Sequence, residues 1–122
     1  MRTFNKHERL CGRKNIDHLF QKGRRFKTKR FLVIWENSIK EQEFPAKILI
    51  SIPKRIILKS SERNYLKRVV REIYRYEKQD FYTTLNAKLR KIHFAIIYLE
   101  NVRMSFNELD AEIKLILNRL KN

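Results

Sequence analysis

The most constraining feature of this sequence is the segment 63–75, where basic and aliphatic side chains recur with the period of an α-helix. At about 100° per residue, the two sets form arcs centred about 80° and about 280° from Arg63, so they face almost opposite directions. The aliphatic arc holds Leu66, Val69, Val70 and Ile73, and the basic and polar arc holds Arg63, Asn64, Lys67, Arg68, Arg71 and Arg75. Such a helix has to bury one side in a core and present cations on the other.

The spacing of these cations disfavours the alternative of an ordinary solvated helix face. Arg63, Lys67 and Arg71 follow one another at i,i+4 steps, where like charges repel and most surface helices place opposite charges. The whole chain has 29 Lys and Arg residues against 13 Asp and Glu, a formal net charge of +16. A polyanion would relieve this repulsion, and the planar arginine fork suits phosphate oxygens.

A second basic element occupies the N-terminal quarter of the chain. Residues 1–30 contain eleven Lys or Arg and two acids, and Phe4, Phe20 and Phe26 lie among them, with Phe31 next in the sequence. Cations beside aromatic rings are typical of single-stranded nucleic-acid binding, because the rings can stack on bases. Core packing is the alternative for each ring taken singly, and some rings can do both along a groove between helix and sheet.

Periodicity predicts a single α+β domain, 1–122, with a small sheet and helices packed on it. Predicted helices are 15–22, about 62–79 with further turns up to 90, and one beginning at the Ser105–Glu108 capping box. Predicted strands are 31–35, with the basic stretch 24–30 as a candidate start of the same strand, then 45–52 and 92–99, with a further candidate at 56–58. Asn15 is expected to cap the first helix and Gly23 to follow it, and Ser60 or Ser61 is expected to cap the second. Met104 and Leu109 fit a hydrophobic staple, and Phe106 joins the apolar stripe of the last helix.

Several classes of protein are disfavoured by the same sequence. No apolar run approaches the roughly 18 residues of a membrane span, and no apolar segment follows the basic N-terminus as in a secretory signal. Cys11 is the single cysteine, so we expect a reducing, cytoplasmic location. His7, His18 and His93 show no metal-ligand spacing, and no paired carboxylates, phosphate loop or nucleophile motif is present. The chain is predicted to bind rather than to catalyse.

The segment 63–72 resembles the signature helix of the bacterial ribonuclease P protein subunit, in which Arg-Asn-Arg or a close variant is followed by Lys-Arg and then by Arg-Glu. Upstream, Arg9-Leu10, the run 16–20 and Gly23 look like the family's opening Arg-Leu, its Phe-x-x-Val-Phe and its glycine. Phe31 is similar to the family's strand phenylalanine, and Lys54-Arg55 resembles its Ser-Lys-Lys turn. Tyr65 stands where the family has its second arginine, and Ile16 and Ile34 stand where it often has aromatic residues.

The resemblance implies a four-stranded α+β sandwich in αβββαβα order, with a left-handed βαβ crossover that carries the basic helix. It implies an accessory role in ribonuclease P, whose catalytic RNA holds most of the Mg²⁺ and removes the 5′ leader of precursor tRNA. No catalytic residue and no protein-held metal is then expected, and the partners are ribonuclease P RNA and precursor tRNA, without a membrane or a small-molecule substrate. The residues implied to bind the catalytic RNA are Arg63, Asn64, Lys67, Arg68, Arg71 and Arg75. Those implied to line the leader groove are Ile16, Phe20, Phe31, Ile34, Lys54 and Arg55.

Two other functions share some of these features. A ribosome-associated or general RNA-binding protein has the same charge and the same mixture of helices and strands. A stand-alone endoribonuclease would use His7 or His18 with a neighbouring cation for proton transfer. Dependence of activity on a cognate catalytic RNA separates the three.

Overall fold

The computed structural model describes residues 4–39 and 41–122. A short 3-10 helix, η1 (Lys6–Glu8), is followed in order by α1 (Arg13–Lys22), β1 (Arg24–Lys27), β2 (Phe31–Asn37), β3 (Ala46–Ser51), α2 (Ser60–Ala87), β4 (Ile92–Tyr98) and α3 (Phe106–Lys121). Apart from η1, this is the predicted αβββαβα order. Within the described ranges, no helix is long and apolar enough to cross a membrane.

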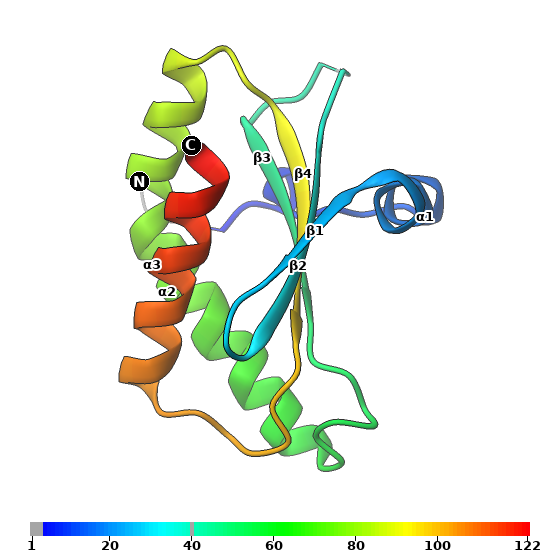
Figure 1. Cartoon of the computed structure of the whole chain (residues 1–122), viewed down its shortest axis with the longest axis vertical. Helices are drawn as coiled ribbons and strands as arrows, with labels where there is room; N and C mark the ends of the chain where they lie inside the picture. The colour runs from blue at the N-terminus through cyan, green and yellow to red at the C-terminus, as the bar shows by residue number, and fades with distance from the viewer. Residues whose placement is uncertain (1–3, 40) are drawn as a thin grey trace.

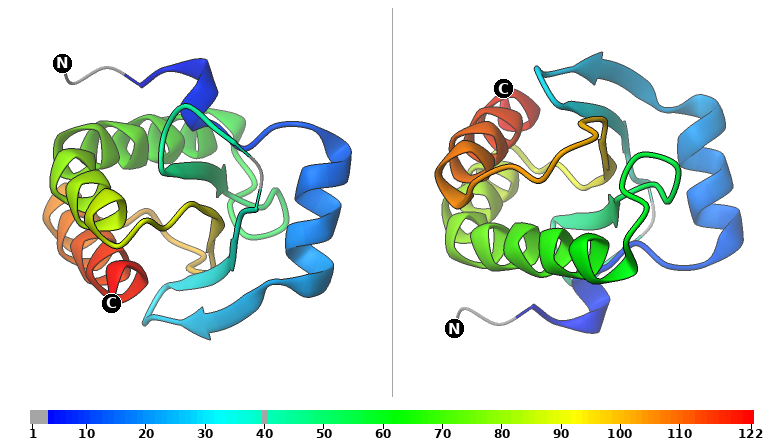
Figure 2. Two further views of the ribbon diagram at one scale, coloured as in Figure 1. Left: turned by 90° about the horizontal axis from the view of Figure 1, so that it is seen from above. Right: turned by 90° about the horizontal axis from the view of Figure 1, so that it is seen from below.

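The four strands form one mixed sheet in the order β1-β2-β4-β3. The pairs β1/β2 and β2/β4 are antiparallel, while β3 and β4 run parallel and are connected through α2. Helices α2 and α3 cover one face of this sheet, and α1 lies against the other (Figure 1). Views along the sheet show the same three layers, with the N-terminal segment passing beside α2 (Figure 2). The predicted α+β class is confirmed.

Alternation along the strands assigns each side chain to one of two cores. In β2, Phe31 and Val33 are fully buried in the large core shared with α2 and α3. Ile34, the next residue, is fully buried in a smaller cluster beneath α1, with Leu10, Leu19 and Ala95. β4 is buried on both faces, which explains why 92–99 is almost continuously apolar.

Helix α1 begins two residues earlier than predicted. Its N-cap is Gly12, at φ +89°, and Asn15 instead donates a side-chain hydrogen bond to the carbonyl of Cys11 at 3.2 Å. Gly23 does end the helix, but at φ −69° rather than in a left-handed conformation. The requirement for glycine is steric, because a Cβ at residue 23 would lie 2.5 Å from the Leu19 carbonyl oxygen and 2.7 Å from Ile34 Cγ2.

Helix α2 is one continuous helix to Ala87, so the predicted helix at about 62–79 and the further turns expected up to 90 form a single element. It begins at Ser60 after Lys59, whose side chain makes no capping bond, so the prediction of a serine cap was wrong. The predicted short strand at 56–58 is also absent; these residues form a turn and bend. Arg63 donates hydrogen bonds to the carbonyls of Ile57 and Leu58, both at 2.8 Å, and so holds this turn against the helix start.

The start of α3 agrees with its sequence signal. Ser105 Oγ accepts a hydrogen bond from the Glu108 backbone N–H at 3.2 Å, and the Ser105 N–H donates to the Glu108 carboxylate at 3.1 Å. Met104 and Leu109 are both buried, as the staple requires. Phe106 is half exposed and does not join the buried stripe formed by Leu109, Ile113, Ile116, Leu117 and Leu120.

Candidate RNA interface

The first half of α2 has the two opposite sides that its sequence predicts. Leu66, Val70 and Ile73 are buried in the large core, whereas Asn64 and Arg68 are exposed. We call the polar side, made of Arg63, Asn64, Lys67, Arg68, Arg71 and Arg75, the basic ridge. Burial of the aliphatic side anchors the helix to the sheet, and the ridge therefore faces away from the core.

The central cations of the basic ridge lack ion-pair partners in the part of the chain that the structure describes. Within residues 4–39 and 41–122, the side chains of Lys67 and Arg68 have no ion-pair or hydrogen-bond partner. Burial, together with the charge of nearby Arg9, lowers the pKa of Arg71. The charge of Arg9 makes the protonated form of Arg71 less favourable, and a phosphate close by would stabilise that form. This favours an anionic partner at this surface.

The two ends of the basic ridge are already engaged within the protein. Arg63 is bonded to the carbonyls of the preceding turn. Arg75 pairs with Glu72 at 2.6 Å, three residues earlier on the same helix. The structure therefore divides the predicted set into a free centre and two ends that also serve the fold.

Arg9 is an addition to the predicted ridge. Leu10 donates its N–H to the Ile48 carbonyl at 2.9 Å, which holds this part of the chain along the edge strand β3. There Arg9 lies over the Phe4 ring, 5.2 Å from its centroid, and shares a hollow of about 210 Å³ with Arg71. No periodic pattern in the sequence predicts this position, because Arg9 follows a short 3-10 helix rather than a long element.

The predicted leader groove is brought together only in part. Ile16 and Phe20 lie on α1, partly exposed, and pack against the small cluster beneath that helix. Ile34 belongs to the cluster itself and is fully buried. Phe31 is fully buried on the opposite face of the sheet, against α2 and α3, so its placement in the groove was wrong. Successive side chains of a strand face opposite sides of the sheet, so Phe31 and Ile34, three residues apart, lie on different faces.

The accessible part of the α1 side is formed by other strand residues. Leu32, Leu49 and Ile97 are partly exposed there and pack around the cluster beneath α1. Across the sheet, Lys27 pairs with Leu32, Leu32 with Ile97, and Ile97 with Ser51. We call the surface made of Ile16, Phe20, Lys27, Leu32, Leu49, Ser51 and Ile97 the open face. It combines apolar side chains, a hydroxyl and a cation, which suits stacked or splayed nucleotides.

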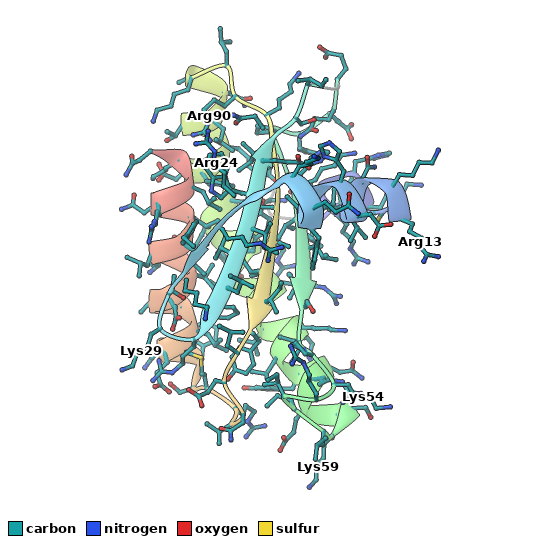
Figure 3. All side chains as sticks on the ribbon, turned by 45° about the vertical axis from the view of Figure 1, so that its right-hand side comes forward. Arg13, Arg24, Lys29, Lys54, Lys59 and Arg90 are labelled. Carbon is teal, nitrogen blue, oxygen red and sulfur yellow. The ribbon has the colours of Figure 1, made fainter. Side chains whose placement is uncertain are left out.

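Lys54 and Arg55 are exposed in the turn after β3. Figure 3 shows Lys54 and Lys59 at the end of the molecule where α2 begins, far from Arg13 on α1. This turn follows directly from β3 and leads into the basic ridge. It therefore places two exposed cations at this end of the molecule, shortly before the basic ridge begins.

The other end of the open face holds two histidines with separate partners. His18 Nδ1 lies 2.9 Å from a Glu36 carboxylate oxygen, and His93 Nε2 lies 3.0 Å from Gln42 Oε1. His18, Glu36 and His93 line a hollow of about 260 Å³. His7 is exposed on η1, a different element. In the described part of the chain, no group of three or more His, Cys, Asp or Glu residues could hold a metal ion.

Comparison with known proteins identifies the family of the chain. The family model described as Ribonuclease P matches residues 4–121. The chain belongs to the ribonuclease P protein family. Curated ribonuclease P protein components with similar sequences include one from Chlorobium phaeobacteroides, 26% identical over 98% of this chain and 88% of its own length. Another, from Geotalea uraniireducens, is 29% identical over 97% of this chain and 95% of its own length.

Solved ribonuclease P proteins share the fold. The Staphylococcus aureus protein superposes with a TM-score of 0.73 at 17% identity, covering 93% of this chain and 95% of that one. The Thermotoga maritima protein gives a TM-score of 0.70 at 22% identity, covering 92% and 96%. At these identities the likeness concerns the backbone fold and does not extend to the side chains of the ridge and open face.

Proposed function

We propose that this chain is the protein subunit of a ribonuclease P ribonucleoprotein. In this proposal the basic ridge binds the catalytic RNA, and the open face holds the 5′ leader of precursor tRNA. The catalytic RNA cleaves the precursor and leaves the mature 5′ end. As a component of tRNA processing, the protein would act in the cytoplasm.

The observation that supports RNA binding most directly is the absence of acidic partners around Lys67 and Arg68 in the described structure. Surface cations in a folded domain commonly pair with nearby carboxylates. Arg75, at one end of the same ridge, does so with Glu72. Unpaired cations on a helix whose opposite side is anchored in the core are held in position to bind phosphate. Neutralising phosphates also releases counterions, which drives association.

The protein contributes charge and position rather than a reacting group. No residue is assigned a catalytic role. His18 and His93, which line the hollow at the end of the open face, are engaged with Glu36 and Gln42. Mg²⁺ is proposed to be held mainly by the RNA, where it supplies charge stabilisation and an activated water. A cationic protein between two RNAs lowers their mutual repulsion, so it strengthens substrate binding and reduces the Mg²⁺ concentration required.

Reconstitution tests this function. The purified protein with its cognate ribonuclease P RNA should accelerate 5′ processing of precursor tRNA at low Mg²⁺, and the protein alone should cleave nothing. Shortening the leader to one or two nucleotides should remove most of the stimulation, because the open face then has nothing to bind. Stimulation independent of leader length would contradict the leader role, and no stimulation at all would favour a general RNA-binding protein.

Cleavage by the protein without RNA would instead favour the endoribonuclease. His18→Ala provides the control for that outcome, because a stand-alone endoribonuclease would use His18 or His7 for proton transfer. The ribonucleoprotein proposal predicts processing close to wild type in this variant at neutral pH.

A further inference from the structure

The side of α2 that carries the basic ridge changes character after Arg75. At about 100° per residue, Asn86 and Gln79 fall about 140° and about 160° from Arg63, at the edge of the ridge's side, and Thr83 falls beside them at about 200°. Together with Phe44 and Tyr82 they line a hollow of about 270 Å³, which Arg75 and Lys78 also border. This volume lies just below the range of about 300–1,000 Å³ for drug-sized ligands. The hollow therefore has room for one small group.

One wall of this hollow is aromatic and rigid. The Phe44 and Tyr82 ring centroids are 6.0 Å apart with a 38° tilt, so the rings contact each other and a planar ligand has to stack outside the pair. The Tyr82 hydroxyl donates to the buried Glu8 carboxylate at 2.6 Å, which fixes the ring. Ring stacking of this kind accepts any nucleobase, because every base has a π-face.

The rim of the hollow offers hydrogen bonds suited to base edges. Gln79 and Asn86 are exposed, and in the described structure their side-chain amides have no protein partner. Each amide carries a donor and an acceptor. Thr83 donates its hydroxyl to the Gln79 carbonyl at 2.8 Å and so remains available as an acceptor.

Arg75 is placed to bind the anionic part of a nucleotide, its phosphate. Its Nε is buried and has no hydrogen-bond partner in the described structure, an arrangement that is unfavourable for a donor. Its terminal nitrogen pairs with Glu72, but the two side chains are 34% and 43% exposed, so this ion pair is weak. A phosphate at the edge of the hollow can replace Glu72 and, with a small rotation of the guanidinium, bond both nitrogens.

We propose that this hollow binds a single unpaired nucleotide of RNA. The base stacks against Phe44 and Tyr82, its edge is read by Gln79 and Asn86, and its phosphate is bound by Arg75. As a site for the catalytic RNA, this inference rests on the proposed function; as a site for a nucleotide, it stands on the residues above. The basic ridge then holds paired RNA by its backbone, and the hollow fixes the register with one extruded base.

Nuclear magnetic resonance on the full-length protein tests the site without RNA. Titration with each 5′-nucleoside monophosphate should give saturable shifts of the Gln79 and Asn86 side-chain amides and of backbone amides between 75 and 86. Inorganic phosphate should shift the surroundings of Arg75 and leave the two side-chain amides unchanged. Equal shifts with phosphate alone, or no saturation in the millimolar range, would overturn the base site.

A matched pair of variants separates this site from general charge. Gln79→Ala combined with Asn86→Ala should weaken nucleotide binding about tenfold or more, because the base-edge bonds are lost. Asn107→Ala combined with Asn118→Ala, at exposed positions of α3, should leave it unchanged. All four positions are exposed, so both proteins should fold. Equal weakening in the two proteins would contradict the assignment.

Reconstitution then distinguishes failure of this inference from failure of the proposed function. Nucleotide binding without stimulation of precursor processing would retain the hollow and reject the ribonuclease P role. Stimulation that is unchanged in the Gln79/Asn86 variant, together with absent nucleotide binding, would reject the hollow and retain the role.

Discussion

Lys78 donates hydrogen bonds to both carboxylate oxygens of Glu8, at 2.8 and 2.7 Å, across 70 residues of sequence. Both side chains are buried, at 7% and 1% exposure. The Tyr82 hydroxyl and the Asn5 backbone N–H donate to the same carboxylate, so both of its oxygens accept hydrogen bonds from more than one donor. This pair fastens η1 to α2 and thereby places the neighbouring Arg9 beside Arg71.

Removing one partner of this pair should strongly destabilise the fold. Lys78→Met leaves the Glu8 carboxylate buried without its cation, and the expected loss is about 3–5 kcal/mol in the free energy of unfolding. Lys114→Met is the matched control, because Lys114 pairs with Asp110 at the surface, where an ion pair contributes little to stability. Urea unfolding followed by circular dichroism measures both, and similar losses would contradict a structural role for the buried pair.

The two sides of α2 should respond to mutation in opposite ways. Leu66 is fully buried, so Leu66→Ala should lower the free energy of unfolding by about 2–5 kcal/mol. At temperatures where the variant remains folded, its RNA affinity should keep the wild-type salt dependence. A change in salt dependence with little loss of stability would show that Leu66 is not part of the core.

Arg68→Ala should have the converse effect. The side chain is exposed and has no partner in the described structure, so stability should change little. If Arg68 contacts a phosphate, the slope of log K against log salt for RNA binding should become shallower by about 0.9. Lys114→Ala removes the same charge from α3 and should leave the slope unchanged. Equal effects would indicate long-range charge rather than contact at the ridge.

The sequence was sufficient for the features that one element determines alone. The opposite arcs of α2 and the capping box at Ser105 depend on local spacing, and both are confirmed. It was insufficient where two elements have to meet. Phe31 and Ile34 were assigned to one groove, although residues an odd number apart in a strand face opposite ways. Which face is open was decided by where α1 packs, and that is a tertiary contact.

Glu8, Lys78 and Gly23 illustrate the same limit. A buried ion pair between residues distant in sequence has no periodic signal, and its partners read individually as ordinary surface charges. Gly23 was expected from its position after a helix, but its requirement comes from contact with Ile34 on another element. The basic ridge was predicted as a uniform row, whereas the turn carbonyls and Glu72 engage its two ends.

The capping box of α3 should make stability depend on pH. Hydrogen bonds from the Ser105 backbone and hydroxyl, with a smaller contribution from Arg30, lower the pKa of Glu108 below its ordinary value of 4.5. The carboxylate therefore stabilises the fold above that pH, and this contribution is lost as pH falls through the lowered value. Glu108→Gln should be less stable than wild type at pH 7, and the difference should shrink toward pH 3. A difference that is constant across urea unfolding at these pH values would contradict the assignment.

The open face can be tested through Phe20, which lies on α1 and is partly exposed against the small cluster. Phe20→Ala should weaken binding of precursor tRNA to the reconstituted enzyme by roughly 1–3 kcal/mol if the ring stacks on a leader base, and leave binding of mature tRNA unchanged. Leu115→Ala, which removes a 57% exposed apolar side chain from α3, is the control and should affect neither. Equal weakening for precursor and mature tRNA would mean that Phe20 acts through stability or through the catalytic RNA, because only the precursor carries a leader.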